Sequence, residues 1–257
     1  MCQILGISSD KPYNANEILR SFYANSKVHK DGWGLALFNG PAVSVEKEPL
    51  QAIRSNYLTK RLASGITCRN LLAHIRLASV GEINYNNCHP FTAQDKSGRT
   101  WTLVHNGTIF EPDLITGYFR YQQGTTDSEA VLLFIIDTVN KAAEEKGRAL
   151  TPEERFEAVD GAVCGLSKDN KLNLIIYDGE VMYVHTNLKE TLFERFEEGT
   201  RIIATEPLTL EGWEPVKMNT LLAYKDGNLV LAGTDHGNEF IPEKHDMSLI
   251  YMSYSGL

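Results

Sequence analysis

Two helix-start signals in the middle of the chain, with strand patterns on either side, constrain the fold more than any other feature. The sequences TDSE at 126–129 and TPEE at 151–154 have Glu three residues after Thr, which is the spacing of a capping box. The first precedes the apolar run AVLLFII and predicts a helix over about 127–145. The second has Pro at the first helical position and predicts another helix that ends near 163.

Short apolar segments of strand-forming residues occupy the rest of the chain. They show no sustained alternation with helices and no phosphate-binding glycine fingerprint. This order favours an α+β fold of antiparallel sheets covered by helices over a doubly wound parallel sheet. We expect a single domain over residues 1–257, because no linker, repeat or low-complexity segment divides the chain.

The expected elements follow from these patterns. Lys11-Pro12 is expected to end the first strand, and residues 79–100 are expected to be irregular. Before the central helices we expect strands at about 3–8, 35–38, 42–47, 70–78 and 101–104 and helices at about 18–23 and 50–62; after them we expect strands at about 172–177, 181–185, 201–204, 221–224 and 229–232.

The charge balance limits the partners of the chain. It carries 25 Lys and Arg against 33 Asp and Glu, a net charge of −8, without a dense basic stretch, so we expect no nucleic-acid partner. No apolar run approaches the roughly 18 residues that a membrane span needs, so we expect no membrane partner. The beginning, MCQILGISSD, has no positive leader before an apolar segment, and we expect a cytoplasmic protein.

The four cysteines lack C-x-x-C spacing, which argues against a zinc ribbon or a thioredoxin-like pair. We expect reduced thiols, no metal and no cofactor. A metal site built from Cys68, His74, Cys88 and His89 matches no standard spacing, and His74 is better explained as a core histidine with satisfied ring nitrogens. A papain-like enzyme with Cys88 or Cys164 as nucleophile lacks the local signature of such families.

Cys2 is the thiol with the largest chemical consequence. A small residue at position 2 permits removal of Met1, which leaves a free α-amine on the residue that carries the thiol. An α-amine titrates near ~7.7–8.0 and a free thiol near ~8.5, so the amine can accept the thiol proton close to neutral pH. The alternative is that Cys2 is a small buried residue at the start of a strand.

Other positions offer groups that complement such a nucleophile. Arg76 ends a predicted strand and can grip a carboxylate through two hydrogen bonds, and the Ser79 hydroxyl follows three positions later. The Asn106 side chain and the Gly107 N–H can converge on an oxyanion. Asp127 at a helix start can receive an ammonium group. The structural alternatives are an ordinary ion pair for Arg76, a turn for Asn106-Gly107 and a favourable interaction with the helix dipole for Asp127.

Together these groups define a substrate. A thiol with its own amine, a carboxylate clamp, an oxyanion pair and an ammonium acceptor fit an amino acid with a side-chain amide. Glutamine is that molecule. The set therefore predicts an amidohydrolase.

At these residues the chain resembles the class II glutamine amidotransferases, which use an N-terminal nucleophile, and within them the stand-alone YafJ-like members. The resemblance covers nearly the whole chain through the motifs MCQILG, HKDGWG, AHIR, HPF at 89–91, HNG, TDSE and ATEPL at 204–208. Several ordered motifs make this signal specific. The resemblance implies a four-layer αββα sandwich, the Ntn-hydrolase fold, which agrees with the order of strands and helices.

The resemblance also implies a chemistry in which the Cys2 thiolate attacks the glutamine amide, ammonia leaves, and water cleaves a γ-glutamyl thioester without a metal. Ser79 stands where the family often has a small or hydroxyl residue near the substrate carboxylate, and the segment around His89 is expected to shape the substrate mouth. The matching positions are Cys2 as nucleophile, Asn106 and Gly107 as oxyanion hole, and Arg76 and Asp127 as clamps for the α-carboxylate and α-ammonium of glutamine.

The chain departs from the larger family members, which carry a synthase that uses the ammonia. We expect no synthase here, because residues 235–257 form only a short aromatic-rich tail. Either a separate synthase takes the ammonia, or the enzyme hydrolyses a γ-glutamyl bond in another metabolite, as related enzymes of ergothioneine and glutathione metabolism do. A non-catalytic partner that binds γ-glutamyl ligands is a third possibility, against which the intact set of site residues argues. The sequence leaves the substrate, the ammonia acceptor and the oligomeric state open.

Overall fold

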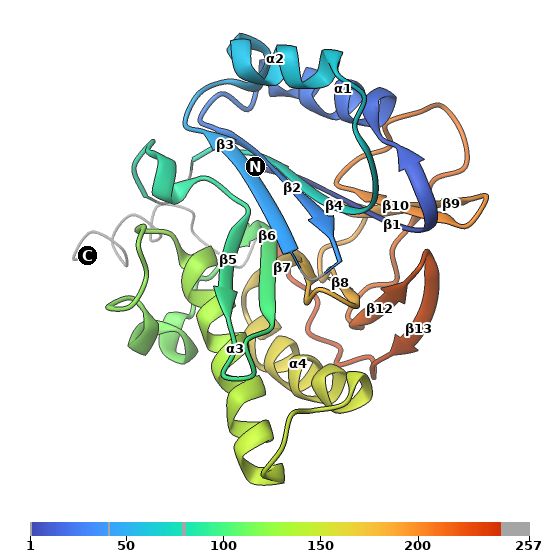
Figure 1. Cartoon of the computed structure of the whole chain (residues 1–257). Helices are drawn as coiled ribbons and strands as arrows, with labels where there is room; N and C mark the ends of the chain where they lie inside the picture. Colours follow the sequence, from blue (N-terminus) through green and yellow to red (C-terminus); the bar gives the residue numbers. More distant parts are fainter. Residues whose placement is uncertain (1, 41, 79–80, 243–257) are drawn as a thin grey trace.

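Two antiparallel sheets form the centre of the structure, a computed structural model that describes residues 2–40, 42–78 and 81–242 (Figure 1). Across the first, sheet A, the order is β11 (Glu214–Pro215), β9 (Phe193–Glu197), β10 (Thr200–Ala204), β1 (Gln3–Asn14), β4 (Thr67–Ile75), β2 (Trp33–Asn39) and β3 (Ala42–Glu48). Across the second, sheet B, the order is β13 (Asn228–Ala232), β12 (Leu222–Lys225), β8 (Met182–His185), β7 (Lys171–Tyr177), β6 (Thr100–Thr108) and β5 (Phe91–Gln94).

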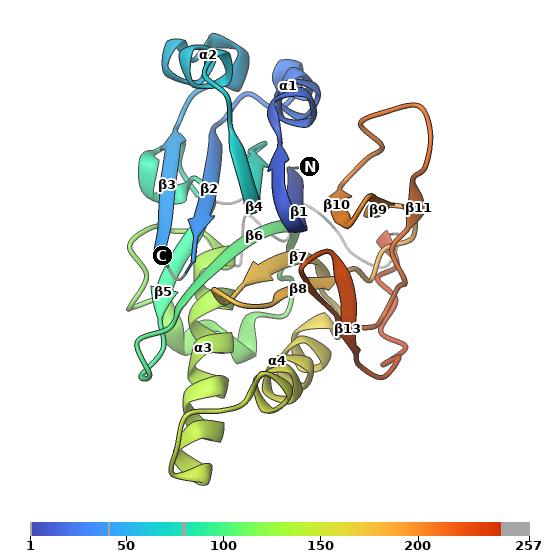
Figure 2. The ribbon, with the colours of Figure 1, turned by 45° about the vertical axis from the view of Figure 1, so that its right-hand side comes forward.

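Helices cover the outer faces of both sheets, so the layers run helix, sheet, sheet, helix (Figures 1 and 2). α1 (Asn16–Ala24) and α2 (Asn56–Ala63) lie over sheet A, and α3 (Asp127–Lys146) and α4 (Pro152–Ser167) lie over sheet B. The expected αββα sandwich is confirmed. Single 3₁₀ turns occur at Asn25–Lys27, Ala52–Arg54, Tyr85–Asn87, Pro112–Leu114 and Thr116–Tyr118.

The side chains of β1 show how the layers are held. Leu5 and Ile7 pack in the cluster under α1 and α2, whereas Ile4 packs in the cluster between the two sheets. Side chains alternate between the two faces of a strand, so a central strand covered on both sides must be apolar throughout. This explains why QILGI is a continuous apolar-rich run rather than an alternating one.

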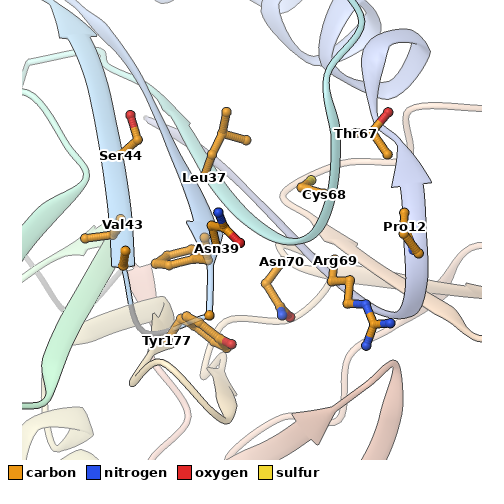
Figure 3. A pocket seen from close by; sticks show the side chains of 13 residues that line it. Pro12, Leu37, Asn39, Val43, Ser44, Thr67, Cys68, Arg69, Asn70 and Tyr177 are labelled. Atoms are coloured by element: carbon orange, nitrogen blue, oxygen red, sulfur yellow. The ribbon is translucent and has the colours of Figure 1, made fainter.

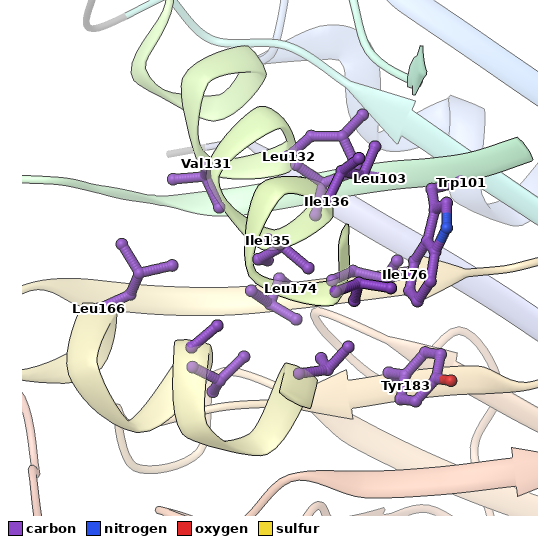
Figure 4. Close-up of a cluster of buried hydrophobic side chains, with 14 of the residues drawn as sticks. Trp101, Leu103, Val131, Leu132, Ile135, Ile136, Leu166, Leu174, Ile176 and Tyr183 are labelled. Carbon is purple, nitrogen blue, oxygen red and sulfur yellow. The ribbon is translucent and has the colours of Figure 1, made fainter. Parts of the chain in front are cut away.

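The cluster between sheet B and its helices fixes the position of α3 (Figure 4). Apolar residues of α3 recur at helical spacing and face apolar residues of β6 and β7, while two aromatic rings lie at one end of the cluster. The labelled members are Trp101, Leu103, Val131, Leu132, Ile135, Ile136, Leu166, Leu174, Ile176 and Tyr183.

The two central helix starts are confirmed, but only one has its capping box. Glu154 N–H donates to the Thr151 hydroxyl (3.3 Å) and Thr151 N–H donates to the Glu154 carboxylate (2.9 Å). At α3 the Thr126 side chain makes no cap bond. The Glu129 carboxylate there accepts the N–H of Gly124 (2.8 Å) instead of closing a box with Thr126, because it is turned to the preceding loop.

Some expected boundaries were wrong. β1 continues past Lys11-Pro12 to Asn14, because an irregularity between Ser8 and Tyr13 lets its pairing with β4 resume. The helix expected over about 50–62 is a 3₁₀ turn followed by α2, because the Ser55 hydroxyl accepts the N–H of Leu58 and starts a new helix.

Three short strands were not predicted. β5 lies in the segment expected to be irregular, and β9 and β11 follow the predicted strand of β8. Their sequences, FTAQ, FERFE and EP, are too short or too polar to show strand periodicity. None of the helices in the described ranges combines the length and apolar character that crossing a membrane requires.

We predict that Leu174→Ala lowers the free energy of unfolding by about 2–5 kcal/mol, because it removes a fully buried side chain from a close-packed cluster. The matched control is Leu229→Ala in β13, where the side chain is 49% exposed and the expected loss is below about 0.5 kcal/mol. Urea denaturation followed by circular dichroism measures both. Equal losses in the free energy of unfolding for the two variants would contradict the burial of Leu174 in this cluster.

Candidate functional site

Cys2 lies at one end of the stacked sheets, directly before β1. Ile4 faces the layer between the sheets, and alternation along the strand turns Cys2 to the same side. The Sγ atom lies 3.4 Å from both the carbonyl oxygen and the backbone nitrogen of Leu77. Residue 2 as a whole keeps some exposed surface, whereas its thiol is enclosed by neighbouring atoms.

Some groups around this thiol raise its pKa and others lower it. Burial raises the pKa of Cys2, while the hydrogen bond from the Leu77 backbone and the positive charges of Arg76 and Lys171 lower it. The burial effect is the larger, so the thiol stays protonated at neutral pH unless a base accepts its proton. The two cations then stabilise the thiolate that forms.

Residues of β6 and β7 face the same layer as Cys2. Val104 and Ile175 pack between the sheets, so Asn106 and Lys171, at even spacing from them, point the same way. The Nζ atom of Lys171 lies 3.4 Å from Oδ1 of Asn106. Asn106 is 2% and Lys171 4% exposed. A polar pair is therefore buried beside the thiol.

Gly107 lies in β6 opposite Leu172, and not in a turn. The N–H of Leu172 donates to Asn187 Oδ1 (2.9 Å) and its carbonyl lies 2.7 Å from His185 Nδ1, so both groups point away from β6. Two facing residues of an antiparallel pair that do not bond each other both point their N–H groups away from the pair. The Gly107 N–H therefore points away from β7, past the first residue of β5. A Cβ on Gly107 would lie 2.1 Å from the Lys171 carbonyl oxygen, so this position requires glycine.

Arg76 is anchored just after the end of β4. Its N–H donates to the Gly32 carbonyl (2.8 Å), and its carbonyl accepts the N–H of Asp31 (3.0 Å). The guanidinium donates to the carbonyl oxygens of Glu82 (2.8 Å) and Gly81 (3.2 Å), and the residue is 2% exposed. Because these acceptors are neutral, the positive charge is held in place without being cancelled by them.

Asp127 begins α3 and is 5% exposed. Its carboxylate accepts the N–H of Ile109 (3.0 Å) and the hydroxyl of Ser128 (3.1 Å). The Ser128 hydroxyl also lies 2.9 Å from Nδ1 of His105 on β6. Burial lowers the pKa of His105, with Asp127 opposing and Lys171 adding to the shift, so Asp127 and Lys171 both act on one imidazole.

His89 packs against His74, with ring centroids 4.0 Å apart and an angle of 34° between the ring planes, and it meets Phe91 edge to face. Burial lowers the pKa of both imidazoles far below their ordinary value. None of their ring nitrogens has a hydrogen-bond partner among the described residues. His74 is fully buried, as expected of a core histidine. Contact between His89 and a substrate stays a prediction.

Asn87 joins the segment that follows Arg76 to the segment that precedes Asp127. It is fully buried and donates to the carbonyl of Glu82 (2.9 Å), which also receives Arg76. Its Oδ1 accepts the N–H of Thr125 (2.7 Å), two residues before Asp127. Asn87 thus links the surroundings of Arg76 and Asp127, and the sequence did not reveal it because a lone Asn in an irregular segment carries no motif.

Lys171 was also missed. The only available signal was a charged residue at the start of the apolar strand segment LNLIIY. Cys2, Arg76, Asn106 and Lys171 lie in one layer, where the charges of Arg76 and Lys171 act on the Cys2 thiol and Lys171 contacts Asn106. Lys171 and Asp127 both act on the imidazole of His105. Ser79 lies outside the described residues.

The other thiols differ from Cys2 in their surroundings. Burial raises the pKa of Cys68 to about 12 and that of Cys88 to about 11. Cys68 lines a cavity of about 660 Å³ with Arg69 and Tyr177 (Figure 3). It stands near the start of β4, whereas Leu77, which contacts Cys2, follows the end of that strand. The cavity is therefore at the opposite end of the sandwich from Cys2.

A metal centre is not evident in the part of the chain that the structure describes: no three His, Cys, Asp or Glu side chains there are grouped to hold an ion. Cys68 and His74 lie six positions apart on one strand, a separation of about 20 Å. The Cys and His residues weighed as zinc ligands therefore do not form one cluster.

Comparison with known proteins identifies similar chains. The sequence model described as "Glutamine amidotransferases class-II" matches residues 1–196. "Putative glutamine amidotransferase YafJ" of Escherichia coli is 30% identical over 84% of this chain and 94% of its own, and a Haemophilus influenzae protein described as "Putative glutamine amidotransferase" is 27% identical over 90% and 86%. The crystal structure of a predicted glutamine amidotransferase from Pseudomonas aeruginosa has a TM-score of 0.64 at 21% identity, covering 90% of this chain and 100% of that one.

We predict that iodoacetamide at pH 8 alkylates folded Cys68 about 50-fold or more slowly than a free thiol. With its pKa at about 12 the thiolate fraction falls by about 10³, and the greater nucleophilicity of the more basic thiolate recovers only part of that loss. Peptide mass spectrometry measures the rates, with Cys164, which is exposed, as the internal control. Faster modification of Cys68 than of Cys164 would contradict the described burial.

Proposed function

This chain belongs to the class II glutamine amidotransferases, and we propose that it uses Cys2, exposed after removal of Met1, to hydrolyse the γ-amide of glutamine or of a γ-glutamyl compound. The observation that carries the proposal is the grouping of Cys2 with Arg76, Asn106 and Lys171 in one layer. Burying cations is costly, and a merely structural cysteine has no need of them.

Substrate binding in this proposal uses the two clamps. Arg76 pairs with the α-carboxylate through its guanidinium, and Asp127 receives the α-ammonium. The clamps come from the end of β4 and the start of α3, and Asn87 bonds to both adjoining segments. This arrangement supports recognition of a free α-amino acid group at a fixed distance from the thiol.

The first chemical step forms a thioester. The Cys2 thiol gives its proton to its own α-amine, and Sγ bonds to the amide carbon as the carbonyl becomes an oxyanion. Donors from Asn106 Nδ2 and Gly107 N hold that oxyanion. The protonated amine then gives its proton to the amide nitrogen, the C–N bond breaks, and ammonia leaves.

The second step consumes one water. The α-amine accepts a proton from the water as the water oxygen bonds to the thioester carbon, and the same donors hold the second oxyanion. The C–S bond breaks and the sulfur is reprotonated. The sum is glutamine plus water giving glutamate and ammonia, with Cys2 restored.

We further propose that residues 1–257 form one domain of this kind. β10, β11, β12 and β13 follow residue 196, yet they complete the two sheets, with β10 paired to β1. The part of the chain beyond the matched family region thus supports the strand that carries the nucleophile.

Cys2→Ala is predicted to lower glutamine hydrolysis by about 10⁴-fold or more, because no other thiol has the same cations and donors around it. Cys164→Ala, an exposed control, should retain full activity. The measurement is glutamate release, with intact mass showing whether the active protein begins at Cys2. Activity that survives Cys2→Ala, or active protein that keeps Met1, would overturn the assignment.

Asp127→Asn is predicted to lower kcat/KM for glutamine by about 10–200-fold, because it removes a charged partner of the α-ammonium worth about 1.5–3 kcal/mol. An amide substrate without the α-ammonium should be hydrolysed slowly and be little affected by the change. Glu145→Gln on the exposed part of α3 is the control. Equal losses for both substrates would show that Asp127 acts on folding instead of on the ammonium group.

The identity of the γ-glutamyl substrate and the fate of ammonia are tested together. We predict ammonia release from glutamine or from at least one γ-glutamyl amide or peptide in a panel assayed with and without cell extract. Greater turnover with extract would support a separate synthase partner. Complete absence of turnover with tight ligand binding would instead support a non-catalytic binding protein.

A further inference from the structure

We propose that Lys171 is a positioning residue of this site, which orients the Asn106 amide toward the oxyanion and holds the Cys2 thiolate. The inference rests on the proposed function of Cys2 and extends it to a residue outside the motifs. Three observations support it: the contact between Lys171 and Asn106, the register of β7 against β6, and the burial of the Lys171 side chain.

The contact constrains the amide. A lysine side chain only donates hydrogen bonds, so the 3.4 Å approach of Lys171 Nζ selects the oxygen of the Asn106 amide. The Nδ2 group is then directed elsewhere and stays available as a donor. An amide turned by 180° would present its oxygen to the oxyanion and repel it. Lys171 therefore decides which end of Asn106 meets the substrate.

The register places the ammonium beside the thiol. Lys171 begins β7 and pairs with Thr108, one residue past Gly107 on β6. Its side chain is on the inter-sheet face with Asn106, and its charge acts on Cys2. The Lys171 carbonyl lies under Gly107, so the same residue borders both oxyanion donors.

The charge is buried at a cost that the site explains. Lys171 is 4% exposed, and burial lowers its pKa to about 8, while Cys2 raises it. Below about pH 8 the side chain is an ammonium that stabilises a thiolate, and above that pH it loses this charge. An apolar side chain would fill the same space without the free-energy cost of burying a charge, so packing alone does not explain a lysine at this position.

The charged and titratable groups around Lys171 are few in the described chain. Cys2 faces it from the start of β1, and Arg76 at the end of β4 acts on the same thiol. His105 on β6 is kept neutral by burial, and Asp127 at the start of α3 acts on that imidazole. The thiol therefore lies near two cationic side chains, Arg76 and Lys171, and in the proposed mechanism its own α-amine is a third group beside it that can carry a positive charge.

Three variants separate the two roles. Lys171→Met removes both donor and charge, Lys171→Gln keeps a donor without charge, and Lys171→Arg keeps both. For each, kcat and KM for glutamine are measured together with the pH dependence of Cys2 alkylation by iodoacetamide, read on the peptide that contains Cys2. Circular dichroism melts establish that each variant is folded.

Lys171→Met is expected to lower kcat by about 10–100-fold with KM changed less than about threefold, and to move the alkylation profile of Cys2 upward by about one pH unit or more. Lys171→Gln should recover part of kcat while the alkylation profile stays shifted. Lys171→Arg should restore the alkylation profile. If Lys171→Met does not fold, the contrast between Gln and Arg tests the same claim.

An alkylation profile of Lys171→Met or Lys171→Gln that superimposes on the wild-type profile, or kcat unchanged in these folded variants, would overturn the inference. Alkylation does not depend on the substrate. The proposed function fails separately, if Cys2→Ala retains turnover.

Discussion

The position of β1 between β4 and β10 is the constraint on which the rest of the structure depends. Hydrogen-bonded partners on both sides fix its register, with Leu5 opposite both Ala73 and Ala204. Because faces alternate along a strand, a slip of one residue would turn Cys2 toward the helices and Leu5 into the layer between the sheets. The register of a buried strand thus determines which side chains the thiol meets.

The electrostatic character of the site follows from that placement. Burial alone would keep Cys2 a protonated thiol, as it keeps Cys68. Cys2 differs because Arg76 and Lys171 share its layer, and in the proposed mechanism its own α-amine takes the proton after removal of Met1. The fold supplies donors and charges from the end of β4 and from β6 and β7, and the proposed nucleophile, Cys2, lies directly before β1.

Sequence patterns predicted the parts of this account that depend on local chemistry. The central helices, most strands and the layered fold were confirmed, since periodic apolar runs and Thr-x-x-Glu signals report burial directly. Lys171 and Asn87 were not predicted. Their importance comes from residues more than sixty and about forty positions away, Asn106 and Thr125, so no local pattern records it. Short strands such as β9 form because a neighbouring strand offers hydrogen bonds, which is likewise a property of the folded chain.

The central claim is that Cys2 carries the γ-glutamyl group during turnover. The most direct measurement is acid quenching of the enzyme during steady-state glutamine hydrolysis, followed by intact and peptide mass spectrometry. The account predicts a hydroxylamine-sensitive γ-glutamyl thioester on the peptide that begins at Cys2. An adduct on Cys68, Cys88 or Cys164 in place of Cys2 would contradict it.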